Sequence, residues 1–237
     1  MWTAVRCISQ KTNDAAYTAK AISPDIIAIP LEGPRLSTKH VDKLASLAER
    51  FNVVAMGPGL GVEEETQEAV RELFRRLAGK RAMVIDADAL KALRGVRASG
   101  AVVYTPHAGE FKALTGAEPP QSLSERMAVV REQAAALGGV ILLKGRYDVI
   151  SDGVRVKVNM TGTPAMTVGG TGDVLTGLVA AFLTKTSDPL EAAAVAAFVN
   201  GLAGEDAAAE LGFHITASDL IERLPRVIRR YAFESIR

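Results

Sequence analysis

The segment Gly169-Gly170-Thr171-Gly172-Asp173 precedes an apolar run that predicts a helix over residues 174–183. Glycines ahead of a helix leave backbone N–H groups free to face an anion, and the helix dipole adds about half a positive charge there. The segment therefore predicts a phosphate site. Asp173 puts a carboxylate beside that phosphate, where it could orient or deprotonate an attacking hydroxyl. The alternative is a capped core helix whose dipole Asp173 complements.

Four other polar segments follow short apolar runs that predict β-strands. They are the turn 57–61, the segment 86–88, the loop 105–110 and the loop 144–148. In open α/β sheets, ligands bind beyond the carboxyl ends of the strands. We therefore expect these segments to lie together at one edge of a sheet.

Each of these segments has two interpretations. The turn 57–61 either approaches a ligand with its backbone or is only a tight turn. Asp86 and Asp88 could organise Mg²⁺ through water, or could belong to a turn and helix cap. We expect His107 to contact a ligand rather than to be structural. Lys144 either meets a nucleotide phosphate or ribose, which we favour, or buries its stem with a solvated head.

Short apolar runs alternate with amphipathic stretches, a pattern typical of βα units around a mainly parallel sheet. The strands should be followed by helices, and the region from 148 to 158 should form a hairpin. The predicted strands are 26–29, 53–56, 82–85, 101–104 and 139–143. Separate helices are predicted to begin near Ser37 and Glu63. From Val174 the chain is predicted to be helical through Leu211, and a final helix begins near Ala217.

Composition favours a single globular domain over residues 1–237. The 28 basic and 27 acidic residues leave no electrostatic case for binding nucleic acid or an acidic membrane. The single cysteine, Cys7, excludes an intramolecular disulfide and fits a reducing compartment. No signal-peptide pattern is present, and no apolar run reaches the about 20 residues that span a bilayer. We expect a cytoplasmic protein with no membrane partner.

Five motifs in one order carry a resemblance to a known family. Together they resemble the ADP/ATP-dependent NAD(P)H-hydrate dehydratases of the ribokinase-like superfamily, and the tail from Ala217 to Pro225 also fits. The fold implied is α/β, with a mainly parallel central sheet flanked by helices on both faces. The motifs are Gly-Pro-Gly-Leu-Gly at 57–61, Asp-Ala-Asp-Ala-Leu at 86–90, Thr-Pro-His-Ala-Gly-Glu-Phe at 105–111, Leu-Lys-Gly at 143–145, and Gly-Gly-Thr-Gly-Asp-Val-Leu-Thr-Gly at 169–177.

The resemblance implies an enzyme of metabolite repair. It would act on the S form of NADH or NADPH hydrate, in which water has added to the nicotinamide 5,6 double bond. A nucleotide would phosphorylate the hydroxyl, and loss of the phosphate would restore the double bond. The phosphoryl donor would be ADP, giving AMP, or ATP, with Mg²⁺ as the accompanying ion.

The resemblance also implies roles for individual residues, and assigns no metal ligand. Asp173 would be catalytic and would contact the hydrate together with Gly59 and His107. Arg146, Tyr147 and Asp148 depart from the small residues usual after Lys-Gly. The nucleotide-binding residues implied are Lys144, Gly145, Arg146, Tyr147, Asp148, Gly170, Thr171 and Gly172.

One departure from the family pattern is large. Members usually begin with a further strand and helix before the strand that corresponds to about residues 3–8, so we expect an N-terminally short domain. Either the sequence is incomplete there, or another chain covers the exposed surface. The uncovered sheet edge leads us to expect a homo-oligomer, a tetramer in particular.

Two alternative functions remain open. A ribokinase-like kinase of the hydroxyethylthiazole or pyridoxal type would share Asp173 and the anion site. A nucleotide-binding protein without turnover would share the binding residues. The loop 105–110, together with the polar segment 159–166 that leads into the glycine motif, favours the dehydratase.

Overall fold

The computed structural model describes residues 6–9, 12–23 and 25–234, which form an α/β fold around a six-stranded sheet. The strand order is β3-β4-β5-β6-β7-β8, parallel from β3 to β6 and antiparallel from β6 to β8. The prediction of an α/β fold with a mainly parallel sheet is confirmed. The strands are β3 (Val53–Met56), β4 (Ala82–Ile85), β5 (Val102–Tyr104), β6 (Val140–Leu143), β7 (Asp148–Ser151) and β8 (Val156–Asn159).

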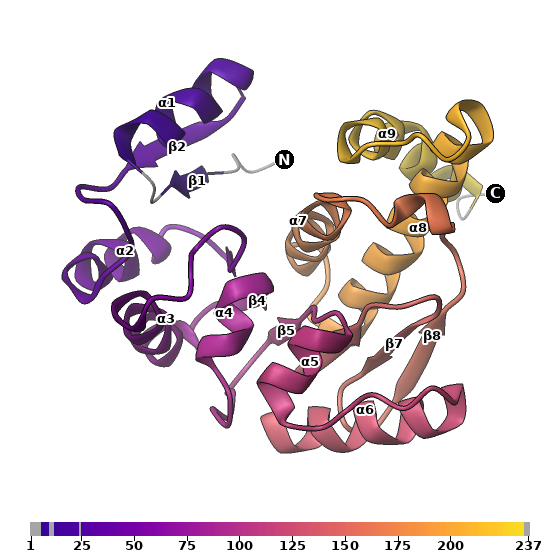
Figure 1. Ribbon diagram of the computed structural model, residues 1–237, viewed down its shortest axis with the longest axis horizontal. Coiled ribbons are helices and arrows are strands. Elements are labelled where there is room, and N and C mark those ends of the chain that lie inside the picture. Colours follow the sequence, from indigo (N-terminus) through magenta and orange to yellow (C-terminus); the bar gives the residue numbers. More distant parts are fainter. Residues whose placement is uncertain (1–5, 10–11, 24, 235–237) are drawn as a thin grey trace.

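The strand predicted at 26–29 lies one residue later and belongs to a second sheet. There β2 (Ile27–Pro30) pairs in parallel with β1 (Arg6–Ser9), with α1 (Thr12–Ile22) between them in the chain. Figure 1 shows this unit at the upper left, on the opposite side from α8 and α9. Of the first strand expected near 3–8, residues 3–5 lie outside the described part.

Alternate residues of the central strands belong to two buried apolar clusters. Met83 and Ile85 of β4 pack in one cluster with residues of α3 to α6, and Val84 packs in the other with residues of α7 and α8. Side chains of a strand point to opposite faces in turn, which explains the alternation. The helices are α2 (Val41–Ala48), α3 (Glu64–Leu77), α4 (Ala87–Ala92), α5 (Ala108–Thr115), α6 (Leu123–Leu137), α7 (Thr171–Leu183), α8 (Pro189–Leu211) and α9 (Ala217–Glu234).

The start of α7 corrects the predicted boundary at Val174. The helix begins at Thr171, after Gly170 as its N-cap with φ of 92°. The first-turn N–H groups of a helix have no partner inside it, so glycine and aspartate are tolerated there despite weak helix propensity. Asp173 therefore sits in the first turn of α7. The sequence patterns also left α1, α5 and α6 unassigned.

Backbone hydrogen bonds beyond the strand ends keep the strand-end loops in register. Asp86 N donates to Met56 O at 3.1 Å, Thr105 N to Ile85 O at 3.0 Å, and Lys144 N to Pro106 O at 2.8 Å. Because these strands are parallel, their carboxyl ends share one edge of the sheet. The loops predicted to carry chemistry thus lie side by side.

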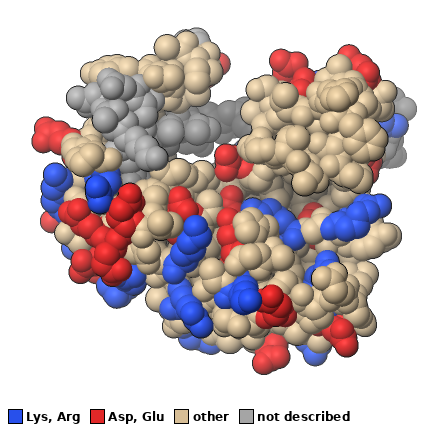
Figure 2. Space-filling model, viewed as in Figure 1, with Lys and Arg blue, Asp and Glu red and all other residues tan. Residues whose placement is uncertain are grey.

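The surface carries charges of both signs. Figure 2 shows acidic and basic side chains interspersed over the face it draws. Within the described ranges, no helix has both the length and the apolar character needed to cross a membrane.

Gly57→Ala should destabilise the fold more than Gly59→Ala. Gly57 has φ of 146°, and a Cβ there would lie 1.8 Å from Asp86 O, whereas Gly59 has φ of 70° and open space around a Cβ. We expect Gly57→Ala to lower the free energy of unfolding by more than about 2 kcal/mol and Gly59→Ala by about 1 kcal/mol. Urea denaturation followed by circular dichroism measures both, and equal losses would contradict the close contact.

Candidate active site

The N-terminus of α7 is shaped to receive an anion. The N–H groups of Thr171, Gly172 and Asp173 occupy its first turn, where no intrahelical acceptor exists. Thr171 Oγ1 lies 2.9 Å from Met166 O and 3.1 Å from Val168 O, which ties the preceding loop to the helix. The dipole and the free N–H groups together favour a phosphate at this point.

Asp173 is exposed at this helix start. Its carboxylate makes no hydrogen bond or ion pair with the described residues. Partial withdrawal from water raises the pKa of Asp173, the charge of Asp86 raises it further, and Lys144 opposes both effects. A carboxylate with a raised pKa and no internal partner is suited to accepting a proton from a bound hydroxyl.

Lys144 lies next to the first turn of α7, held by a buried carboxylate. Its Nζ is 3.0 Å from Asp86 Oδ1, and Thr176 Oγ1 donates to Asp86 Oδ2 at 2.7 Å. The same Nζ lies 3.4 Å from where a Cβ on Gly172 would stand. The structure therefore brings together Lys144, Gly172 and Asp173, which the sequence placed in one site.

His107 is the N-cap of α5, and it forms a reciprocal capping box with Glu110. Its Nδ1 accepts from the backbone N–H groups of Gly109 and Glu110 at 3.0 and 3.3 Å, while Glu110 Oε2 accepts from His107 N at 2.9 Å. Glu110 Oε2 also lies 3.7 Å from Lys144 Nζ. His107 thus has a structural role, and its ring remains 60% exposed toward solvent.

The turn 57–61 packs closely on the segment after β4. Its backbone closes by a hydrogen bond from Leu60 N to Gly57 O at 3.2 Å, and Gly61 N donates to Asp88 Oδ2 at 3.0 Å. Of its glycines, Gly59 has open space where a side chain would be. The turn is therefore tight, and Gly59 is the member with room for a ligand.

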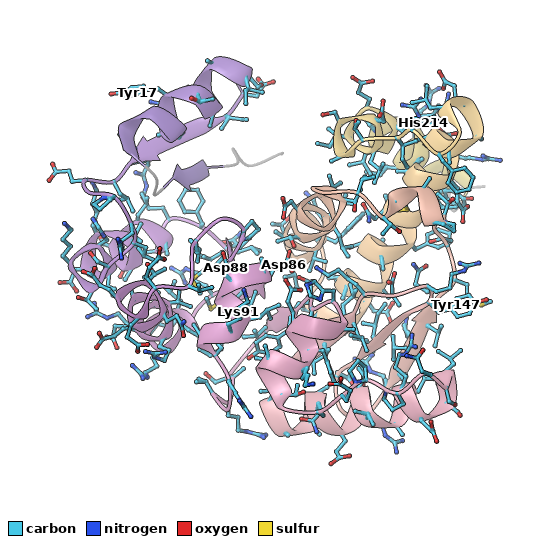
Figure 3. The ribbon with its side chains drawn as sticks, viewed as in Figure 1. Tyr17, Asp86, Asp88, Lys91, Tyr147 and His214 are labelled. Atoms are coloured by element: carbon cyan, nitrogen blue, oxygen red, sulfur yellow. The ribbon has the colours of Figure 1, made fainter. Side chains whose placement is uncertain are left out.

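In the loop after β6, Asp148 is held by hydrogen bonds within the protein, whereas Arg146 is exposed to solvent. Asp148 accepts from Gly145 N at 3.1 Å and from Asn159 Nδ2 at 2.9 Å, and burial raises the pKa of its carboxyl. Arg146 is exposed and lies over the ring of Tyr147 at 4.9 Å. Figure 3 shows Tyr147 far from Asp86, which lies near the centre of the molecule. The Asp148 carboxylate thus serves the fold rather than an open binding surface.

The acidic residues of the site do not form a ready-made metal centre. Asp86 faces Lys144 and Thr176, whereas Asp88 faces Gly61 N and Lys91. Figure 3 shows the two carboxylates and Lys91 at the centre of the view. No group of three or more potential ligand side chains suited to a metal occurs among the described residues.

Two contributors were missed by the sequence analysis. Glu110 had a readable signal, because a Glu three residues after an N-cap is the capping-box pattern. Thr176 lies within the motif at 169–177, but no local signal pointed to its contact with Asp86, 90 positions away in the chain.

Comparison with known proteins is consistent with this geometry. A profile of the family described as NAD(P)H-hydrate dehydratase matches residues 5–226. The ADP-dependent (S)-NAD(P)H-hydrate dehydratase of Nitrosopumilus maritimus is 41% identical over 217 residues, covering 90% of this chain and 75% of that protein. The bifunctional NAD(P)H-hydrate repair enzyme of Hyperthermus butylicus is 43% identical over 213 residues, covering 86% of this chain. The chain spans 40% of that bifunctional enzyme.

Solved structures share this fold, among them a ribokinase-like superfamily protein of Enterococcus faecalis with a TM-score of 0.76 at 23% identity, covering 95% of this chain and 76% of that one. The ADP/ATP-dependent NAD(P)H-hydrate dehydratase of Bacillus subtilis, co-crystallised with ATP/Mg²⁺, has a TM-score of 0.77 at 30% identity, covering 92% of this chain and 76% of that one. The hydroxyethylthiazole kinase of Pyrococcus horikoshii has a TM-score of 0.63 at 20% identity, covering 94% of this chain and 89% of that one, a likeness of fold alone. By its profile match and these sequence identities, the chain belongs to the NAD(P)H-hydrate dehydratase family.

Proposed function

We propose that the chain catalyses the nucleotide-dependent dehydration of (S)-NAD(P)H hydrate, with ADP giving AMP and phosphate. The proposal rests on one observation, which is that a carboxylate without an internal partner and a fixed ammonium flank the same helix N-terminus. Asp173 supplies the carboxylate, and Lys144 supplies the ammonium beside Gly172. Membership of the family supports the identity of the substrate.

In this mechanism, Asp173 takes the proton of the hydrate hydroxyl while the hydroxyl oxygen forms a bond to the terminal phosphorus of the nucleotide. The bond between that phosphorus and the bridging oxygen breaks, and AMP leaves when ADP is the donor. The N–H groups at the start of α7 and the Lys144 ammonium stabilise negative charge on the transferring phosphoryl group. Departure of the phosphate with its bonding electrons, and loss of a ring proton, then restores the double bond.

The charges at the site suit a Mg²⁺ ion that arrives with the nucleotide. Asp86, Glu110 and Asp173 set three carboxylates against the single ammonium of Lys144. Mg²⁺ keeps several waters and binds through substrate phosphates with few protein ligands, which fits a site where Asp86 is already paired. When bound, Mg²⁺ would neutralise charge on the phosphates.

We propose that Gly59 and His107 contact the hydrate together with Asp173. Open space at Gly59 and the exposed ring of His107 support this assignment. We assign the loop from Lys144 to Asp148, with Gly170, Thr171 and Gly172, to the nucleotide, where the Asp148 carboxylate contributes by holding Gly145 N in place. Arg146 is exposed and Tyr147 is half-buried, with the Arg146 guanidinium over its ring, so both lie where a nucleotide could reach them.

We propose that the chain acts as one cytoplasmic domain that assembles as a homo-oligomer. The two apolar clusters support helix layers on both faces of the sheet. Val195 and Phe198, both exposed and apolar on α8, support a surface for assembly. Light scattering coupled to size exclusion tests the expected tetramer, and a monomeric mass at all concentrations would contradict it.

The direct test adds purified NADH hydrate and Mg²⁺ to the chain, first with ADP and then with ATP. Recovery of the near-ultraviolet absorbance of NADH, with stoichiometric AMP or ADP, supports the proposal and identifies the donor. Phosphorylation of hydroxyethylthiazole or pyridoxal, without recovery of the NADH absorbance, would show instead that the chain is a small-molecule kinase. Tight nucleotide binding with no turnover of any of these substrates would assign a binding protein.

Asp173→Asn should abolish dehydration while nucleotide binding largely persists. The amide keeps the shape of the side chain but cannot accept the hydroxyl proton, so kcat should fall about 100-fold or more. Steady-state kinetics and calorimetric titration with ADP measure the two effects. A variant with nearly unchanged kcat would exclude Asp173 as the general base.

His107→Ala should raise KM for the hydrate more than KM for ADP. The same change removes the N-cap of α5 and should lower the free energy of unfolding by about 1 kcal/mol. His107→Asn is the matched control, because asparagine restores a capping acceptor without an imidazole. If His107→Asn recovers both stability and KM, the role of His107 is capping alone.

A further inference from the structure

We propose that Asp86 is a positioning residue that fixes the Lys144 ammonium beside the phosphoryl-binding end of α7. The inference deepens the proposed function and rests on it for the identity of the reaction. Asp86 is 2% exposed and divides its two oxygens between Lys144 Nζ and Thr176 Oγ1. Neither the glycine motif nor the nucleotide-binding segment includes this aspartate.

A lysine needs a hydrogen-bonding partner such as Asp86 if its ammonium is to stay in one position. Its four-carbon stem is flexible, and holding the ammonium in one position costs rotamer entropy. Here Asp86 Oδ1 holds Nζ at 3.0 Å, and Nζ lies against Gly172, where a Cβ would come within 3.4 Å. The ammonium is therefore fixed where charge develops during phosphoryl transfer.

Asp86 is itself held rigidly. Thr176, on the second turn of α7, donates to its other oxygen, so the carboxylate also ties the helix to the end of β4. Gly57 packs so closely that a Cβ would lie 1.8 Å from Asp86 O. Ala87, the next residue, has φ of 48°, which L-residues rarely adopt and which persists only where the surroundings enforce it.

Two other roles explain Asp86 less well. A metal ligand explains Asp86 less well, because an ammonium and a hydroxyl already contact its two oxygens, and the neighbouring carboxylate of Asp88 faces Gly61 and Lys91 instead. A purely stabilising pair is also a weak explanation, because burying an ion pair costs about as much desolvation as its attraction returns. A buried carboxylate that places a catalytic charge accounts for both contacts.

The pair also acts on the proposed general base. The charges that face Asp173 are Asp86 at the end of β4 and Lys144 at the end of β6, and Glu110 of α5 lies behind Lys144. Asp86 raises the pKa of Asp173 and Lys144 lowers it. The pKa of Asp173 therefore reports whether the Lys144 ammonium stays beside it when Asp86 is removed.

The first test needs no substrate. The pKa of the Asp173 carboxyl is measured by carbon-13 NMR in the free protein and in Asp86→Asn, Lys144→Met and the double variant. We expect Lys144→Met to raise the pKa in the otherwise unchanged protein. The rise caused by Lys144→Met should be much smaller in the Asp86→Asn background, because a released ammonium no longer lies beside Asp173. An equal rise in both backgrounds would overturn the positioning role.

The second test is kinetic. Displacement of a positioned group should lower kcat about 10- to 100-fold in Asp86→Asn, and the double variant should be no slower than Lys144→Met alone. If the fold-losses in kcat of the two single variants multiply in the double variant, Asp86 acts independently of Lys144, and the positioning role is overturned. Glu191→Gln, which breaks the distant Lys157–Glu191 pair, is the matched control and should retain full activity. An inactive wild type would reject the proposed function, while the NMR cycle would still decide the role of Asp86.

Discussion

The register of the parallel strands is the constraint on which the site depends. Backbone hydrogen bonds continue past the ends of β3 to β6, so Gly57, Asp86, Thr105 and Lys144 emerge at one edge of the sheet. Parallel pairing is evenly spaced, and a shift of one residue would turn each side chain to the other face. The apolar clusters on the two sides oppose such a shift. The strand register thus brings together loops that are far apart in sequence.

The N-terminus of α7 must hold charges of opposite sign within one turn. Its N–H groups and dipole attract a phosphate, while Asp173 in the same turn repels one. Burial raises the pKa of Asp173, the charge of Asp86 raises it further, and Lys144 lowers it from the neighbouring loop. A carboxylate whose pKa is raised is a stronger proton acceptor than one held by hydrogen bonds or ion pairs. The Asp173 carboxylate is therefore less stabilised than a paired one and more able to accept a proton during phosphoryl transfer.

The described contacts of the site come from the segment between β3 and α9. Gly57 to Gly61, Asp86, His107, Lys144 and the first two turns of α7 all belong to it, with Ala217 of α9 closing on Gly170. Figure 1 shows the unit of α1, β1 and β2 at the upper left. The matched relatives are longer than this chain, and the B. subtilis enzyme extends beyond the shared 76% of its length.

The sequence by itself determined the strands of the central sheet, the position of the polar loops at their ends, and the glycine motif with Asp173. These are local features, because strand alternation, glycine turns and helix starts depend on neighbouring residues. Tertiary structure decided which polar groups pair. Asp86 meets Lys144 across 58 positions and Thr176 across 90, so it is a partner of a cation rather than a free metal ligand. No local pattern encodes such pairs, since only the packing of distant segments brings the atoms within reach.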